Sequence, residues 1–79
     1  MKIPVGWKMI RDSSEFTAWI KPGSYLLTLD YHSNDNSWEV NLGDADEEVE
    51  VYYYNTFFNK DVALKKCLEL MKHTPHEAI

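Results

Sequence analysis

The stretch KPGSYLLTLDY, residues 21–31, joins the clearest turn signal in the chain to its most regular strand pattern. Pro22 followed by Gly23 is typical of a type II turn, because glycine adopts the required positive φ without strain. After the turn, Tyr and Leu occupy every second position of Tyr25–Tyr31. This period of two predicts a strand with one apolar face, bounded by turns as in an antiparallel sheet.

The residues on both sides of this stretch predict further strands. Side-chain alternation places them at residues 3–11, Glu15–Lys21, Ser37–Leu42 and Val49–Tyr54. The apolar face of the second strand is expected to carry Phe16, Ala18 and Ile20. One face of the first strand is expected to carry Val5, Trp7 and Met9. The reverse face of the sheet is expected to hold the surplus aromatic residues Trp19, Tyr52 and Tyr54.

The hydrophobic period changes after residue 59 and predicts one helix. Asn59 suits the N-cap, Asp61 the first turn, and Lys72 and His73 the last turn. An i, i+3, i+4 stripe comprises Ala63, Leu64, Cys67, Leu68 and Met71. The expected fold is α+β, a four- to five-stranded antiparallel β-meander with one C-terminal α-helix packed on one face. We expect a single domain over residues 1–79, with a frayed tail at 74–79.

The most unusual chemical feature is an acidic segment centred on GDADEEVEVYYYN, residues 43–55. Five carboxylates fall within seven residues: Asp44, Asp46, Glu47, Glu48 and Glu50. From Pro22 to Asn59 there are eight acids and no Lys or Arg, so this middle carries −8, and the two ends together carry +3 to give the net charge of −5. Two interpretations remain open. The acids form a solvated loop that protects an edge strand from aggregation, or they steer a basic partner to this surface.

The sequence lacks the signatures of an enzyme or a metal protein. No catalytic motif is present, and the single cysteine, Cys67, lies on the apolar stripe, where we expect it to fill the core. The acidic loop expected at Gly43–Glu48 lacks the residue order of a calcium-binding loop. His73 and His76 are the only close histidine pair and have no third ligand nearby. We therefore expect a protein that is not an enzyme and binds no cofactor or metal.

Charge and cysteine content limit the partners and the compartment. A net charge of −5 argues against a nucleic-acid or anionic-membrane surface, which needs clustered Lys and Arg. One cysteine fits a reducing compartment. No apolar run approaches the length of a membrane span, and the N-terminal residues lack the apolar core of a signal peptide. We expect a soluble protein of the host cytoplasm.

The whole-chain pattern carries a resemblance to one class of proteins. It consists of a Trp-bearing first strand, a PGSY turn and strand, a WEV strand, the acidic loop and a closing NKDVALKKCLELM helix. Over about residues 5–73 this pattern resembles the small anti-defence proteins of phages and other mobile elements. Among them, several anti-CRISPR proteins are compact acidic domains that occupy the nucleic-acid groove of an effector complex. The resemblance implies an inhibitor that acts as a DNA mimic.

Two functional hypotheses follow. The first is a non-enzymatic inhibitor of a basic host protein or ribonucleoprotein complex, such as a CRISPR effector, without direct contact with nucleic acid or membrane. Its expected partner-binding residues are Asp44, Asp46, Glu47, Glu48, Glu50, Tyr52, Tyr54, Glu39 and Asp35. The second is a structural or assembly module that self-associates through an exposed strand edge or the aromatic sheet face. We expect a monomer or a homodimer, and a stable dimer whose mass is unaffected by salt favours the second hypothesis.

Overall fold

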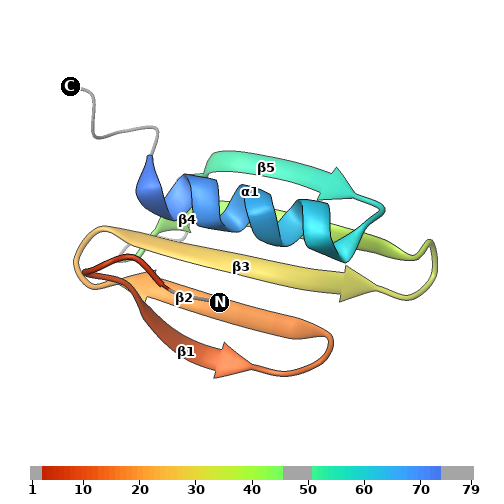
Figure 1. Ribbon diagram of the computed structural model, residues 1–79, viewed down its shortest axis with the longest axis horizontal. Coiled ribbons are helices and arrows are strands. Elements are labelled where there is room, and N and C mark those ends of the chain that lie inside the picture. Colours follow the sequence, from red (N-terminus) through yellow and green to blue (C-terminus); the bar gives the residue numbers. More distant parts are fainter. Residues whose placement is uncertain (1–2, 46–50, 74–79) are drawn as a thin grey trace.

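A computed structural model describes residues 3–45 and 51–73. The elements are β1 (Lys8–Asp12), β2 (Phe16–Lys21), β3 (Tyr25–His32), β4 (Ser37–Asp44), β5 (Val51–Phe57) and α1 (Lys60–Lys72). The strands form one antiparallel sheet in the order β1-β2-β3-β4-β5, and α1 lies across one of its faces (Figure 1). The predicted α+β meander with a single helix is confirmed. The predicted frayed tail, residues 74–79, lies outside the described residues.

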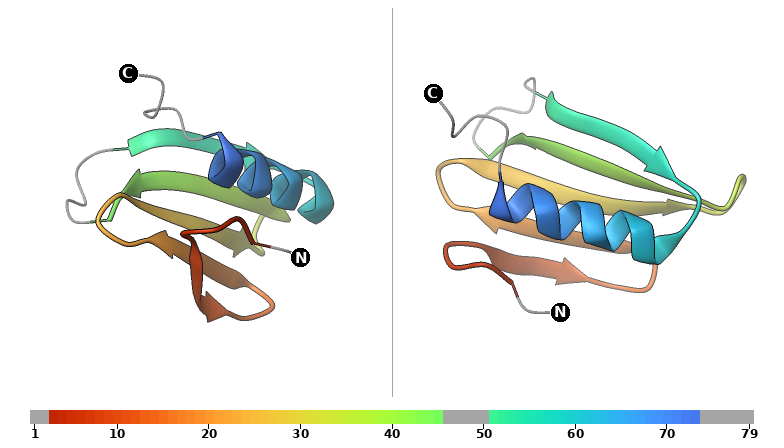
Figure 2. Two further views of the ribbon diagram at one scale, coloured as in Figure 1. Left: turned by 60° about the vertical axis from the view of Figure 1, so that its left-hand side comes forward. Right: turned by 45° about the horizontal axis from the view of Figure 1, so that its top comes forward.

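The opposite face of the sheet is free of helix in the part of the chain that the structure describes. Figure 2 shows α1 on one side of the sheet, above β3, β4 and β5. We call the two sides the helix face and the helix-free face. Side chains alternate between them along each strand, so the pairing register decides which residues are available at the surface.

The first strand begins later than the alternation predicts. The Trp7 N–H donates to the Pro4 carbonyl at 3.3 Å, and Gly6 adopts a φ of 95°. This is a type II turn, which glycine at the third position permits. The turn ends the expected alternation, so Val5 is fully exposed while Trp7 is buried before β1 begins. The prediction that Val5 and Trp7 share a face of a strand is therefore wrong.

The faces of β2 are the reverse of the prediction. Trp19 pairs with Leu27, and both side chains are fully buried in the core on the helix face. The other face of β2 therefore carries Phe16, Ala18 and Ile20. The inward face carries Thr17 and Lys21 beside Trp19, so alternation alone favours the face of Phe16, Ala18 and Ile20 as the buried one. The turn at Pro22–Ser24 fixes the register, and the register places Trp19 inside.

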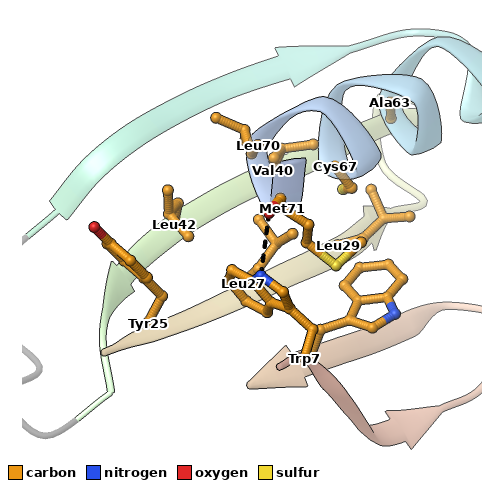
Figure 3. Close-up of a cluster of buried hydrophobic side chains, with 11 residues drawn as sticks. Trp7, Tyr25, Leu27, Leu29, Val40, Leu42, Ala63, Cys67, Leu70 and Met71 are labelled. Atoms are coloured by element: carbon orange, nitrogen blue, oxygen red, sulfur yellow. Dashed lines mark hydrogen bonds between the residues drawn. The ribbon is translucent and has the colours of Figure 1, made fainter. Parts of the chain in front are cut away.

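The core lies between α1 and the centre of the sheet (Figure 3). Its buried residues are Trp7, Trp19, Tyr25, Leu27, Leu29, Val40, Leu42, Ala63, Cys67, Leu70 and Met71. Leu64 and Leu68 of the predicted helical stripe pack against this cluster and are partly buried. Trp7 stacks beside Tyr25 with 6.1 Å between ring centroids, and its indole N–H donates to the Met71 carbonyl at 3.2 Å. The segment before β1 is thereby joined to the last turn of α1.

The two ends of α1 agree with the sequence. Asn59 is the N-cap, and its side-chain oxygen accepts from the Asp61 N–H at 2.8 Å and the Val62 N–H at 3.2 Å. Asp61 lies in the first turn and Lys72 in the last, where each charge is favourable to the helix dipole. The helix position was predictable because these signals are local to the chain.

Replacing Trp7 with Phe tests the link between the N-terminal segment and α1. The change removes the indole donor and part of the ring, so we expect the free energy of unfolding to fall by about 1–3 kcal/mol. Urea unfolding followed by fluorescence of the remaining tryptophans measures this change. The control Val5→Ser alters a fully exposed side chain and should change stability by less than about 0.5 kcal/mol. Equal effects of the two substitutions would contradict the assigned contact.

Candidate functional site

The described charges are divided between the elements. Every Lys and Arg in residues 3–45 and 51–73 lies in β1, β2 or α1: Lys8, Arg11, Lys21, Lys60, Lys65, Lys66 and Lys72. Strands β3, β4 and β5 carry only the acids Asp30, Glu39 and Asp44. The acid-only middle of the sequence thus becomes one continuous half of the sheet, because these three strands are neighbours.

The register separates the predicted contact residues onto two faces. Glu39 pairs with Asp30 on one side and Thr56 on the other, and Asn41 pairs with Tyr54. Glu39 and Tyr54 therefore lie on the helix-free face as diagonal neighbours, roughly 7–8 Å apart between Cα atoms. Asp44 pairs with the core residue Tyr25, which places it on the helix face, near the other end of β4. Glu39 and Asp44 do not form one patch.

Asp30 and Glu39 form a like-charge pair bridged by a histidine. The two residues are directly opposite on β3 and β4. His32 Nε2 lies 2.7 Å from Glu39 Oε2 and 3.9 Å from Asp30 Oδ2. The hydrogen bond to Glu39 raises the pKa of His32, opposed by desolvation, and the charges of Asp30 and Glu39 raise it further. The ring therefore holds a proton more tightly here than in water, which reduces the repulsion between the two carboxylates.

Asp35 borders this group from the β3–β4 turn. Its Oδ1 accepts from the Ser37 hydroxyl at 2.6 Å, and its charge also acts to raise the pKa of His32. Asn36 closes the turn with a φ of 55°, a conformation that asparagine tolerates better than most residues. We define the acidic face as Asp30, His32, Asp35, Glu39 and Tyr54. It contains three of the predicted contact residues and two, Asp30 and His32, that were not among them.

Tyr52 does not lie on the predicted face. Val51 pairs with Gly43 and Tyr53 with Leu42, so Tyr52 is the extra residue of a β-bulge. Its ring lies edge-to-face with the Tyr25 ring, with 5.5 Å between the ring centroids, and its hydroxyl donates to Asp44 Oδ2 at 3.2 Å. The prediction that Tyr52 shares the outward face with Tyr54 is wrong, because the bulge resets the alternation between them.

The remaining four predicted acids fall between Asp44 and Val51 in the sequence. Asp46, Glu47, Glu48 and Glu50 are outside the described residues. The acidic face is therefore built from three sources: the outward residues of β3 and β4, the turn between them, and Tyr54 of β5. Tyr54 is 57% exposed, and the side chains of Asp30 and Glu39 are 44% and 24% exposed. These groups are accessible to a partner.

The remaining chemical candidates of the sequence are its cysteine, a metal site and a membrane span. Cys67 is fully buried, as predicted for a core residue, and burial raises the pKa of its thiol to about 12. It therefore carries no thiolate at neutral pH. Within residues 3–45 and 51–73, no three His, Cys, Asp or Glu side chains gather in a metal-binding arrangement. No helix of the same residues is long and apolar enough to cross a membrane.

Comparison of the chain with protein families, curated proteins and solved structures found no match. The binding chemistry of the acidic face therefore follows from its own geometry. It presents carboxylates that accept hydrogen bonds from ammonium or guanidinium groups, beside one exposed aromatic ring with a polar tip. This combination suits the binding of a cationic protein surface.

The raised pKa of His32 predicts how stability changes with pH. Because the folded protein binds this proton more tightly than the unfolded chain, the stabilisation is fully present below the ordinary pKa of 6.5. It is lost as the pH rises through the higher folded pKa. His32→Gln should abolish this loss, so the two melting temperatures should converge above the folded pKa. Thermal melts across a pH series, with NMR titration of the ring protons, test this.

A second variant separates the bridge from general charge effects. Glu39→Gln removes the carboxylate that contributes most to the shift, so the NMR titration of His32 should move to lower pH. An unchanged titration in Glu39→Gln would show that the hydrogen bond does not hold the proton.

Proposed function

We propose that this protein is a non-catalytic inhibitor that binds a basic, nucleic-acid-binding surface of a host protein through its acidic face. The observation that carries the proposal is the separation of charge: β3, β4 and β5 carry Asp30, Glu39 and Asp44 without a single Lys or Arg. On the helix-free face, the basic side chains lie toward the other edge, where the Arg11 guanidinium sits 5.5 Å from the centre of the Phe16 ring.

Carboxylates on adjacent strands match what a nucleic-acid-binding groove recognises. Directly opposite residues are about 5 Å apart between Cβ atoms, so Asp30 and Glu39 present two acceptors to one Lys or Arg cluster. Such clusters normally neutralise phosphates. Asp35 extends the row of acids at the turn, and Tyr54 supplies a rigid aromatic contact of the kind enriched in interface hot spots. The acidic face then acts as a nucleic-acid mimic.

The acidic loop belongs to the same proposal. Asp46, Glu47, Glu48 and Glu50 add to the negative charge of the segment between β4 and β5. We propose that these acids act mainly on the rate of encounter, because long-range attraction steers a basic partner toward this half of the protein. A CRISPR effector complex is one host assembly with a basic groove, in line with the sequence resemblance.

His32 adjusts the strength of the same surface. When protonated, its ring occupies the two carboxylates that the partner would otherwise contact. A basic partner therefore binds more tightly as the pH rises through the pKa of His32. The stability of the folded protein falls over the same pH range.

Paired neutralising variants test the acidic face. Asp30→Asn with Glu39→Gln removes two charges from the helix-free face, whereas Asp61→Asn with Glu69→Gln removes two from α1 on the other side. Each protein is immobilised and exposed to host lysate across a salt series. We expect the wild type and the α1 variant to retain basic nucleic-acid-binding proteins at low salt, and the acidic-face variant to lose most of them. Equal retention by both variants would assign the binding to net charge alone.

The contribution of the loop is tested separately. Replacing three of the acids Asp46, Glu47, Glu48 and Glu50 with Ser should lower the association rate and the salt dependence of binding to the captured protein. Surface plasmon resonance measures both. Unchanged kinetics in this variant would limit the contact to the acidic face or to an apolar surface.

A further inference from the structure

The two edges of the sheet differ in how well they resist the addition of another strand. β1 is five residues long, contains Lys8, Arg11 and Asp12, and has a bulge between Met9 and Arg11. Short length, charge and bulges are the features that protect an edge. β5 is seven residues long and contains no charged residue. Its bulge lies near its start, and the pairing is regular from Tyr53 to Phe57.

We propose that β5 is a dimerisation edge that pairs with β5 of a second copy of this chain. The strands run antiparallel about a two-fold axis at Tyr54, which joins the two sheets into one of ten strands. This inference goes beyond the proposed function and rests on the chemistry of the edge. β5 lies at the outer side of the sheet, with β4 as its only neighbouring strand among the described residues (Figure 1).

Alternate residues of β5 direct their backbone groups toward this edge. The Thr56 N–H donates to the Asn55 side chain at 2.8 Å, which marks it as a donor that points away from β4. Because ladder groups alternate along a strand, Tyr54 also directs its N–H and C=O outward. Two copies related by the axis therefore exchange a pair of hydrogen bonds between their Tyr54 residues. Thr56 already has a side-chain partner, so Tyr54 is the principal backbone contact.

The side chains are compatible with this pairing. The axis places Tyr54 opposite Tyr54 of the second copy on the helix-free face, and Tyr53 opposite Asn55 on the helix face. Cross-strand aromatic pairs contribute about 0.5–1.5 kcal/mol beyond the area that they bury. No cross-strand pair joins like charges, because β5 has none. A chain with a net charge of −5 can self-associate most easily where its surface is locally uncharged.

The helices leave room for the contact. α1 contacts β3, β4 and β5 and lies chiefly over β4. Three strand spacings separate the two β4 strands in the dimer, which places the helix axes about 14 Å apart. Helices are about 10–12 Å wide, so they do not collide. The Lys66 Nζ lies 4.8 Å from the centre of the Tyr53 ring, so this side of α1 faces β5. Val62, one turn earlier on the same side, is exposed where the two helices of the dimer face each other.

Light scattering tests the proposal against the wild-type mass. We expect a dimer whose mass does not change with salt, because the contact is uncharged. Tyr54→Lys should give a monomer with an unchanged circular dichroism spectrum, since it places two ammonium groups opposite each other on the axis. Ile10→Lys is the matched control: Ile10 is 56% exposed on the β1 edge, close to the 57% of Tyr54, and its substitution should leave the dimer intact.

Charge complementation establishes the self-pairing of position 54. Tyr54→Glu should also be monomeric, and a mixture of the Tyr54→Lys and Tyr54→Glu proteins should form a heterodimer. A monomeric wild type at millimolar concentration would overturn the proposal. So would a dimer that survives Tyr54→Lys, or a mixture that stays monomeric.

Disulfide formation provides a measurement that does not depend on destabilising the contact. Residues of a hydrogen-bonded antiparallel pair have Cα atoms about 5.5 Å apart, within the range of a disulfide. Tyr54→Cys should therefore form a covalent dimer under mild oxidation, while Ile10→Cys should not. Cys67 does not compete, because it is fully buried. Equal cross-linking of the two variants would overturn the pairing.

The salt response separates this contact from the proposed function, since only binding to a basic partner weakens with salt.

Discussion

The burial of Trp19 opposite Leu27 is the contact on which the arrangement of the sheet depends. The turn that fixes it is closed by the Ser24 N–H, which donates to the Lys21 carbonyl at 2.9 Å, with Gly23 at a φ of 76°. The indole N–H of Trp19 has no hydrogen-bond partner among the described residues. An unmet donor costs about 1–3 kcal/mol, whereas burying roughly 200 Å² of ring stabilises by about 5 kcal/mol. The apolar term is larger, and Trp19 stays inside.

Local signals in the sequence were sufficient for the elements and their order. Pro22 and Gly23 predicted a turn, and Asn59 predicted the helix start, because each acts within a few residues. The predictions that were wrong depend on contacts between residues far apart in the sequence. The inward face of β2 depends on its register with β3, and Trp19 is the one large apolar side chain on that face. Tyr52 lies in a run of three tyrosines that fits either alternation, so only the paired structure reveals the bulge.

The charge of the site was predictable from the sequence, but the positions of its side chains on the sheet were not. The sequence identified an acid-only middle, and the order of the strands keeps it together as one half of the sheet. The sequence did not indicate that Asp30 and Glu39 are opposite each other, since this follows from the register set by the β3–β4 turn. Nor did it separate Asp44, which the pairing with Tyr25 places on the helix face. The role of the acids in binding a partner stays a prediction.

The opposed carboxylates give the proposed binding role a further argument against simple solubility. Like charges directly opposite on neighbouring strands destabilise a sheet, and a solvated face gains the same solubility from acids placed apart. His32 relieves the repulsion in part, and only while it holds a proton. A cationic partner would relieve it as well, because it replaces the ring between Asp30 and Glu39. The repulsion in the free protein then adds to the affinity of the complex, since binding removes it.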